Sequence, residues 1–463
     1  MIVSVSESTW CVLFLLIHSS SSALIDLFRI PQVRTPGEAR GMKYYALDFM
    51  GLAEQYGYRA ETHDVTTDDG YILSINRILP NGIDLDGTSD HRVVFLQHGM
   101  AASSDSFVLF GPNMSLAYLL SDAGYDVWLG NVRGNTYGRR HTRLSPNDSG
   151  FWDFSLDELA TLDLAAMIDY VVNHTRQSSM TFVGYSIGGT IGTLLLADRP
   201  EYNEKINLAI FLAPFYPWAV MTPMRQVLVR ILDLWQQMIP NGAVETSSQT
   251  VLLPAFFENF CMANNYTIKL CLSVCKFFVG VDGVQTTVGN LNRFTRHFPS
   301  GTSLKVFNYF LQRYNKDNVD HFDYEDSRIN LQRYGQTQPP FYNLSNIVVP
   351  MVLFSAASDP LVTKEDLVKF SRNFVSSDKL TFESVNYPHF GHLDFVSVEI
   401  VEHMCEALKP TRPSRGRART FVLHDTLDYQ DYRHQCPVPH PKNSKNCEET
   451  TKASSCITEH KNT

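Results

Sequence analysis

The sequence has no apolar run long enough to cross a membrane. The apolar block near its start, Trp10–Ile17, spans eight residues, and nothing later is long and apolar enough either. A helix needs about 20 such residues to cross a hydrocarbon core. Positive charge is not in excess, because 39 Lys and Arg residues stand against 48 Asp and Glu residues, a net charge of −9. We therefore expect no transmembrane segment and no nucleic-acid partner.

Cysteine is also scarce, at 8 of 463 residues. No Cys or His cluster with ligand spacing surrounds Cys271 and Cys275, so we expect no zinc site, no other metal and no cofactor. Cys261 and Cys271 are close enough in sequence to close a small loop, and an oxidising compartment would favour that bond.

No Lys or Arg precedes the apolar block, so only the amino terminus supplies positive charge there. The block is nevertheless followed by Ser19–Ser22 and Ala23, as in a secretory signal peptide covering residues 1–23. Its length excludes the alternative of a membrane anchor. Asn-x-Ser/Thr sequons, which accept glycans in exported proteins, begin at Asn113, Asn147, Asn173, Asn265 and Asn343.

What the sequence does contain is a repeated pattern of short apolar runs and helix-like segments. Such runs, apolar on both faces, predict a mainly parallel sheet with helices on both sides, an α/β fold. The expected strands are Arg92–Leu96, Val127–Leu129, Met180–Val183, Leu208–Leu212, Val348–Phe354 and Thr381–Val385. Segments 157–172 and 364–374 have the spacing of crossover helices.

The interval between the expected strands Leu208–Leu212 and Val348–Phe354 is too long for a crossover. Residues 214–345 are therefore expected to form an inserted, mostly helical cap. The two parts of the core would be residues 24–213 and 346–409. Residues 410–463, a basic run followed by polar sequence, are expected to be disordered. Within the cap, an apolar helix face predicts core packing, or alternatively a lid over a lipid site. It comprises Val227, Leu228, Ile231, Leu234, Trp235 and Met238.

The pentapeptide Gly184-Tyr185-Ser186-Ile187-Gly188 lies between an expected strand and a helix-like run, Thr190–Ala197. A serine on a sharp strand-to-helix turn needs nearly side-chain-free neighbours, because the two backbones pass close together. Such a turn exposes the hydroxyl of Ser186 to a substrate. A glycine-rich turn with an ordinary serine is the alternative.

A nucleophilic serine needs a histidine to accept its proton and a carboxylate to orient that histidine. On a doubly wound sheet these groups follow later strands, in the order Ser, Asp, His. Asp359 and His392 occupy such positions. His389 is the main competitor for His392. Asp366, Asp378, Asp394 and His403 are weaker alternatives, and Asp394 is expected to brace the loop.

The oxyanion of an acyl-transfer intermediate must be met by backbone N–H groups. The residue after the nucleophile, Ile187, supplies one candidate. The second should follow the strand Arg92–Leu96, which places Met100 there, after His98 and Gly99. We expect His98 to be structural rather than a proton carrier.

Together these residues resemble the acid lipase family of α/β-hydrolases, which includes gastric and lysosomal lipases and their invertebrate relatives. The likeness extends from about Pro36 to Leu408. It includes His63–Leu73, His98-Gly99, Tyr125–Asn135, Leu144–Pro146, Phe151–Ser155, Gln338–Tyr342 and His392–Phe395. The family commonly has Gly-His-Ser-Gln-Gly around the serine and a leucine at the oxyanion position that follows the strand Arg92–Leu96. This chain has Tyr185, Ile187 and Met100 there, which changes the walls of the pocket.

The resemblance implies an α/β-hydrolase fold with Ser186 as nucleophile, Asp359 as acid and His392 as base, and with Met100 and Ile187 as oxyanion donors. It also implies a Cys261–Cys271 pair in the cap and a lipid interface in contact with that cap. The expected activity is that of a secreted or lysosomal lipase acting on triacylglycerol or sterol ester. Two alternatives are a non-catalytic lipid-binding protein and an esterase, thioesterase or acyltransferase for small acyl groups.

Overall fold

The computed structural model describes residues 26–81, 92–284, 286–314, 316–372, 374, 379–385 and 387–397. The expected signal peptide, the expected disordered tail, and the alternatives Asp378 and His403 all lie outside the described residues.

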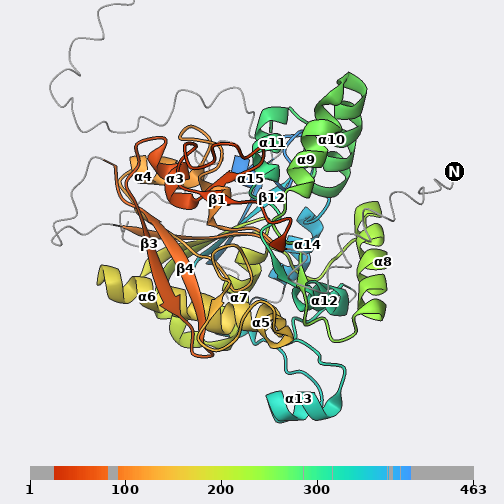
Figure 1. Cartoon of the computed structure of the whole chain (residues 1–463). Coiled ribbons are helices and arrows are strands. Elements are labelled where there is room, and N and C mark those ends of the chain that lie inside the picture. Colours follow the sequence, from red (N-terminus) through yellow and green to blue (C-terminus); the bar gives the residue numbers. More distant parts are fainter. Residues whose placement is uncertain are drawn as a thin grey trace, which may run out of the picture. The chain divides into compact units, whose positions relative to one another are not determined.

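A central sheet organises the described part of the chain (Figure 1). Its strands are β3 (Ala60–Thr66), β4 (Tyr71–Ile78), β5 (Val93–Gln97), β6 (Asp126–Leu129), β7 (Arg140–His141), β8 (Met180–Tyr185), β9 (Ile206–Leu212), β12 (Met351–Ala356) and β13 (Leu380–Val385). They lie in the order β13-β12-β9-β8-β5-β6-β4-β3, with β7 paired to β4. The strands from β13 to β6 are all parallel, which confirms the predicted mainly parallel sheet.

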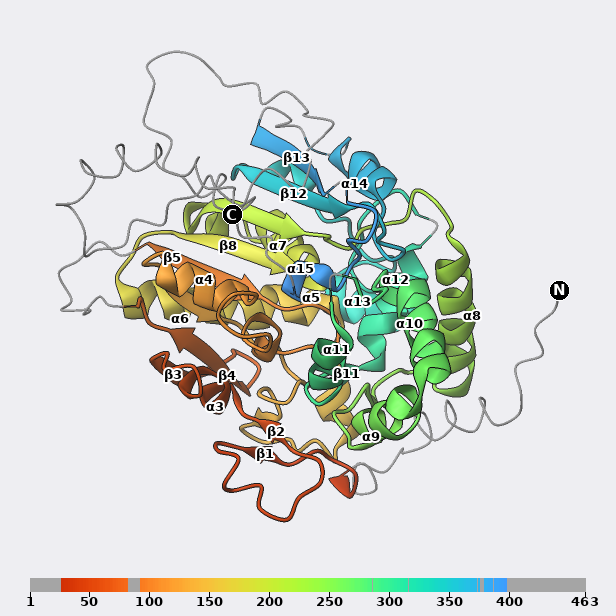
Figure 2. The same cartoon turned by 90° about the horizontal axis from the view of Figure 1, so that it is seen from above.

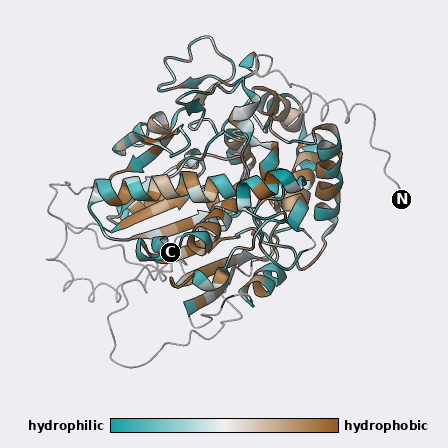
Figure 3. Cartoon of the chain, turned by 90° about the horizontal axis from the view of Figure 1, so that it is seen from below, coloured by the Kyte–Doolittle hydropathy of each residue, from teal (hydrophilic) through white to brown (hydrophobic). Residues whose placement is uncertain are grey.

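The central parallel strands are apolar because helices cover both faces of the sheet, whereas the edge strand β13 is only half-buried. Every residue of β5 and β6 is buried. Figure 3 shows the strands as hydrophobic, whereas the helices over them alternate in character. Helix α4 (Leu116–Asp122) covers one face, and α6 (Ala165–Thr175) and α7 (Ile187–Asp198) cover the other (Figure 1). The sequence pattern therefore located the centre of the fold.

The antiparallel edge formed by β3 and β4 was not predicted. These strands pair from Ala60–Ile78 to Thr66–Ile72, and β4 also runs antiparallel to β6. Only one residue of β3, Val65, is buried, because this strand lies at the edge of the sheet. An edge strand that is mostly polar lacks the continuous apolar run by which the other strands were recognised.

The remaining core helices are short. They are α3 (Phe49–Glu54), α5 (Leu156–Glu158), α14 (Lys364–Ser371) and α15 (Asp394–Ser397). The predicted helix 157–172 consists of α5, a π-helical segment at Leu159–Leu164, and α6. A two-stranded parallel pair, β1 (Gln32–Val33) and β2 (Ala46–Leu47), precedes the sheet.

The segment 214–345, called the insertion below, is mostly helical in its described residues. It contains α8 (Pro223–Met238), α9 (Leu252–Asn259), α10 (Asn265–Val279), α11 (Val288–Thr295), α12 (Leu304–Arg313), α13 (Ser327–Tyr334) and a short antiparallel pair, β10 (Glu245–Thr246) and β11 (Thr302–Ser303). Figure 2 shows α8 to α12 gathered on one side of the strands. None of the helices formed by the described residues has the length and apolar character needed to cross a bilayer.

The apolar face predicted for α8 packs against the protein only in part. Three of its residues are half-buried and three are exposed, while Arg225 and Leu232 are buried; the half-buried ones are Leu228, Ile231 and Trp235, and the exposed ones are Val227, Leu234 and Met238. Arg225 and Leu232 are seven residues apart and therefore lie on one helix face. Helix α8 turns that face inward, because the paired guanidinium of Arg225 anchors it.

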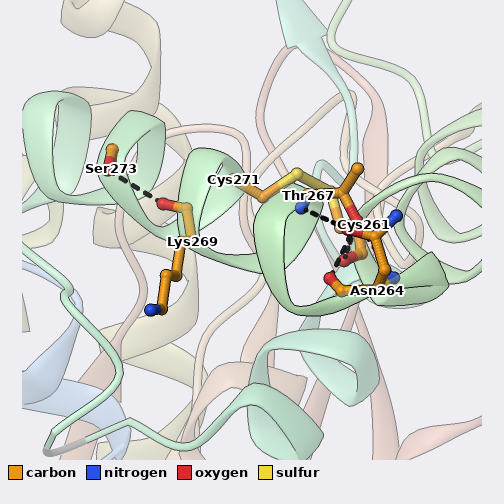
Figure 4. Close-up of a disulfide and its surroundings, with 6 residues drawn as sticks. All are labelled: Cys261, Asn264, Thr267, Lys269, Cys271 and Ser273. Atoms are coloured by element: carbon orange, nitrogen blue, oxygen red, sulfur yellow. Dashed lines mark hydrogen bonds between the residues drawn. A yellow bond between two sulfur atoms is a disulfide. The ribbon is translucent and has the colours of Figure 1, made fainter.

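A disulfide joins Cys261, in a 3-10 turn after α9, to Cys271 in the middle of α10 (Figure 4). Asn264 caps the start of α10 by accepting hydrogen bonds from the backbone N–H groups of Tyr266 and Thr267. The hydroxyl of Thr267 also donates to the Cys261 carbonyl, at 3.2 Å. The disulfide and these bonds hold the start of α10 on the preceding turn.

The buried ion pair between Arg225 and Asp366 joins α8 to α14. The Arg225 Nη1 donates to Asp366 Oδ1 at 3.1 Å, and both side chains are almost completely buried. Removing one partner leaves an unpaired buried charge, so we expect Arg225→Met to lower the free energy of unfolding by about 3–5 kcal/mol. Urea denaturation would measure this, with Arg328→Met at the exposed pair with Asp326 as a control of little effect. The double variant Arg225→Met/Asp366→Leu should regain part of the loss; an equal loss in both variants would contradict the assignment.

His321, in the insertion, lies between carboxylates of two core helices. Its Nδ1 is 3.4 Å from Asp157 Oδ2, and its Nε2 is 3.4 Å from Asp198 Oδ1. Burial lowers the pKa of His321, but the two carboxylates outweigh that effect and raise it from 6.5 to about 9. A raised folded-state pKa stabilises the fold fully below the unfolded pKa, and this stabilisation is lost as the pH rises through the folded pKa. Stability should therefore fall between about pH 6.5 and pH 9 more steeply in the wild type than in His321→Gln. Identical slopes in thermal denaturation would refute this.

Candidate active site

Ser186 lies on a strained turn between β8 and α7. Its backbone has φ 53° and ψ −122°, a conformation that residues other than glycine rarely adopt. A Cβ on Gly184 would lie 2.5 Å from the Gly189 nitrogen, and one on Gly188 would lie 2.3 Å from the Gln97 carbonyl oxygen. Both positions therefore require glycine, as predicted from the sequence for a sharp strand-to-helix turn.

Ser186, His392 and Asp359 form one chain of hydrogen bonds. The His392 Nε2 is 3.0 Å from Ser186 Oγ, and the His392 Nδ1 is 2.6 Å from Asp359 Oδ2. A carboxylate only accepts hydrogen bonds, so His392 carries its proton on Nδ1 and Nε2 accepts the hydroxyl proton of Ser186. This arrangement can transfer the serine proton to the imidazole. The three residues are only 5–6% exposed.

The other oxygen of Asp359 is held by the backbone. Its Oδ1 accepts N–H groups from Leu361 at 2.8 Å and Val362 at 2.9 Å. These bonds fix the carboxylate on the turn after β12, so that Oδ2 faces the imidazole of His392. The turn thus positions the acid without a further side chain.

The alternative residues have other partners. Asp366 pairs with Arg225, and the Nδ1 of His389 lies 2.6 Å from Asp282 Oδ2. Asp394 Oδ2 accepts the Gly391 N–H at 2.8 Å, so Asp394 braces the loop as expected. None of these three side chains has a hydrogen bond to Ser186 among the described contacts.

The two expected oxyanion donors follow neighbouring parallel strands. Ile187 is the first residue of α7 and Met100 follows β5, whose Gln97 pairs with Gly184 of β8. A Cβ on Gly99 would lie 3.1 Å from Ser186 Cβ, so this loop passes directly against Ser186. Met100 and Ile187 are therefore candidates for the oxyanion donors.

His98 has a structural environment. Its Nε2 accepts the Val132 N–H at 3.5 Å, so its Nδ1 carries the proton that is donated to the Gly99 carbonyl at 2.8 Å. Burial lowers the pKa of His98 to about 4, which keeps the ring neutral. His98 thus braces the loop that follows β5 and has no hydrogen bond to Ser186, Asp359 or His392.

Two contacts of His392 were not visible in the sequence. The Tyr185 hydroxyl donates to the His392 carbonyl at 3.1 Å, and the His392 N–H donates to the Val279 carbonyl at 2.8 Å. From the sequence, Tyr185 is only a departure from the histidine that is common in the family, and its contact with His392 could not be predicted. The second bond comes from α10, and a backbone carbonyl in a distant helix leaves no sequence signal.

Glu61, His63 and His174 form a group of metal-capable side chains within the described residues, with ligand atoms inside 4.8 Å of one another. The guanidinium of Arg77 already donates to Glu61 Oε2 at 2.9 Å, and the same oxygen lies 3.1 Å from His63 Nε2. A fixed positive charge therefore occupies the place where a cation would gain most from the carboxylate. The group lies on β3 and α6, apart from the serine.

Comparisons with known proteins identify the family of this chain. A family model described as "alpha/beta hydrolase fold" matches residues 92–396, and one described as "Partial alpha/beta-hydrolase lipase region" matches residues 49–111. Lipase member K of Homo sapiens is 33% identical over 74% of this chain and 85% of its own length. Lipase 3 of Drosophila melanogaster is 36% identical over 74% and 86% of the two chains.

Gastric triacylglycerol lipase of Homo sapiens is 33% identical over 77% of this chain and 88% of its own length. Among solved structures, a soluble variant of monoglyceride lipase from Saccharomyces cerevisiae has a TM-score of 0.42 at 15% identity, over 76% and 93% of the two chains. The chain therefore belongs to the acid lipase family of α/β-hydrolases and is a carboxylic ester hydrolase of the lipase type.

Proposed function

We propose that this chain hydrolyses ester bonds of neutral lipids, triacylglycerol or sterol ester, through an acyl-enzyme on Ser186. The observation that carries the proposal is the continuous hydrogen-bond chain from Ser186 Oγ through His392 to Asp359. Gastric triacylglycerol lipase is a relative whose name states one of these substrates. Both substrates combine a carboxylic ester with a long acyl chain.

In the proposed reaction, Ser186 Oγ attacks the ester carbonyl while His392 Nε2 takes the hydroxyl proton. The negative charge on the tetrahedral oxygen is met by the N–H groups of Met100 and Ile187. The C–O bond to the alcohol then breaks, and His392 returns its proton to the leaving alcohol. Water, deprotonated by His392, attacks the acyl-enzyme and releases the fatty acid together with the regenerated serine.

The insertion is proposed to act as the cap over this site and to contact the lipid surface. The three triad residues are almost completely buried, and we propose that part of the insertion moves to admit a bulky lipid. Helix α10 presents an exposed apolar stripe, namely Tyr266, Leu270, Val274 and Phe277. Because these residues recur at helical spacing on one face, the stripe suits contact with an apolar surface.

We also propose that the chain enters the secretory pathway and acts outside the cell or in lysosomes. The five sequon asparagines are all exposed in the structure. Each is therefore accessible to a glycan, and Asn265 lies at the start of α10, beside the proposed lipid-contacting stripe.

Replacing the nucleophile tests the catalytic assignment. We expect Ser186→Ala to fold as the wild type does and to lose at least about 10⁴-fold of the esterase rate. A fluorophosphonate should label the wild type at Ser186, identified by peptide mapping, and leave the variant unlabelled. Ser371→Ala, whose hydroxyl donates only to the Val368 carbonyl within α14, serves as the serine control. An unlabelled wild type that copurifies with lipid would instead indicate a lipid-binding protein.

Charges placed on the α10 stripe test the lipid contact. Leu270→Glu/Val274→Glu should lower the rate on emulsified long-chain triacylglycerol about tenfold or more, because a charged face is repelled from an apolar surface. The rate on a soluble short-chain ester should remain near that of the wild type. Leu331→Glu, at an exposed position of α13, is the control. Equal losses on both substrates would remove the stripe from lipid binding, and equally fast hydrolysis of short and long esters by the wild type would favour a small-acyl esterase.

A further inference from the structure

The end of α10 lies against the loop that carries His392. Val279, the last residue of α10, accepts the His392 N–H at 2.8 Å. Carbonyls in the last turn of a helix have no partner within the helix, so this bond serves both elements. The backbone of the proposed general base is thus attached to the insertion.

Backbone packing brings the same helix end against both triad loops. Gly280 ends α10 in the left-handed conformation, with φ 79°. A Cβ there would lie 2.3 Å from the Ser358 carbonyl oxygen and 2.7 Å from Gly391 Cα. Ser358 precedes Asp359, and Gly391 precedes His392, so no side chain separates the helix end from either residue.

Two side-chain contacts extend this attachment. Asp282 Oδ2 lies 2.6 Å from His389 Nδ1, and Thr286 Oγ1 donates to Asp394 Oδ1 at 2.6 Å. Asp394 in turn accepts the Gly391 N–H. The pKa of Asp282 is lowered: partial burial opposes this, but hydrogen bonds from His389, the Val284 N–H and Lys276 outweigh it. The carboxylate of Asp282 therefore stays ionised for this contact.

We propose that the end of α10, residues 279–284 together with Thr286, positions His392 for catalysis, with Asp282 acting through His389 as a positioning residue. The inference rests on the proposed triad. One helix then carries the apolar stripe on its exposed face and the attachment to His392 at its carboxyl end. Displacing α10 would deprive His392 of its N–H partner and loosen the loop from Tyr387 to Asp394.

The loop is also held by the core. The Tyr185 hydroxyl donates to the His392 carbonyl, Asp359 holds the ring, and Ser358 donates its N–H and its hydroxyl to the Phe390 and Pro388 carbonyls. None of these contacts fixes the peptide N–H of His392 or the side chain of His389. Loss of the α10 contacts should therefore misalign the imidazole while leaving the protein folded.

The test is Asp282→Ala, measured with a soluble short-chain ester and by the rate of fluorophosphonate labelling. We expect kcat and the labelling rate to fall together by about tenfold to a hundredfold, with KM unchanged, because misplacement of a catalytic group slows the chemical step. Asp282→Asn should restore part of both rates, since its amide oxygen can still accept from His389. Lys276→Ala, which removes only the exposed partner of Asp282, should stay within about twofold of the wild type.

A double-mutant cycle separates positioning from general damage. If Asp282 acts through His389, the variant Asp282→Ala/His389→Ala should be no slower than the slower single variant, because coupled residues are not additive. Additive losses, or an Asp282→Ala variant with wild-type kcat and labelling rate, would overturn the proposal. Should Asp282→Ala fail to fold, the same two rates are measured for Thr286→Val, which removes the other side-chain contact between this segment and the loop. A wild type unlabelled at Ser186 would refute the triad itself, whereas a labelled wild type with unaffected variants refutes only the role of α10.

Discussion

The 3.0 Å contact between Ser186 Oγ and His392 Nε2 joins residues that are 206 positions apart in the chain. It exists because β8, β12 and β13 lie in one parallel sheet, so the turns that follow them meet at the same edge. The pairing of β12 with both β9 and β13 brings Asp359 and His392 beside the serine turn. The proposed catalysis therefore depends on that shared edge.

The edge also explains why strain is tolerated at Ser186. A positive φ at a serine costs of order 1–3 kcal/mol. The turn is held by the bond from the Ser186 N–H to the Leu212 carbonyl and by tight packing at Gly184 and Gly188. The surrounding backbone thus leaves the serine little alternative conformation, which keeps its hydroxyl directed toward the imidazole.

The sequence was sufficient for the parts of the molecule that have a repeating or local signature. The central parallel strands are continuous apolar runs, and Ser186 and Asp359 follow two of them closely, whereas His392 lies on the loop after the half-buried strand β13. The edge strand β3 escaped because it is polar, and the apolar face of α8 was assigned to the core because spacing does not show which face a helix turns inward. That direction depends on Arg225, whose partner Asp366 lies 141 residues away. Long-range pairs of this kind have no signature in a single sequence.

The same reasoning applies to the histidine. The role proposed for the side chain of His392 could be predicted from its place after β13. The contacts of its backbone could not, because they come from Tyr185 in the core and from Val279 in the insertion. Tyr185 differs from the residue usual in the family, yet it gains a hydroxyl that reaches the His392 carbonyl. A tyrosine beside the proposed nucleophile can therefore change the pocket wall and still support the proposed base. In the proposed triad, the catalytic geometry is a joint product of the core sheet and the insertion, so we expect that changes in the insertion must keep the end of α10 in place.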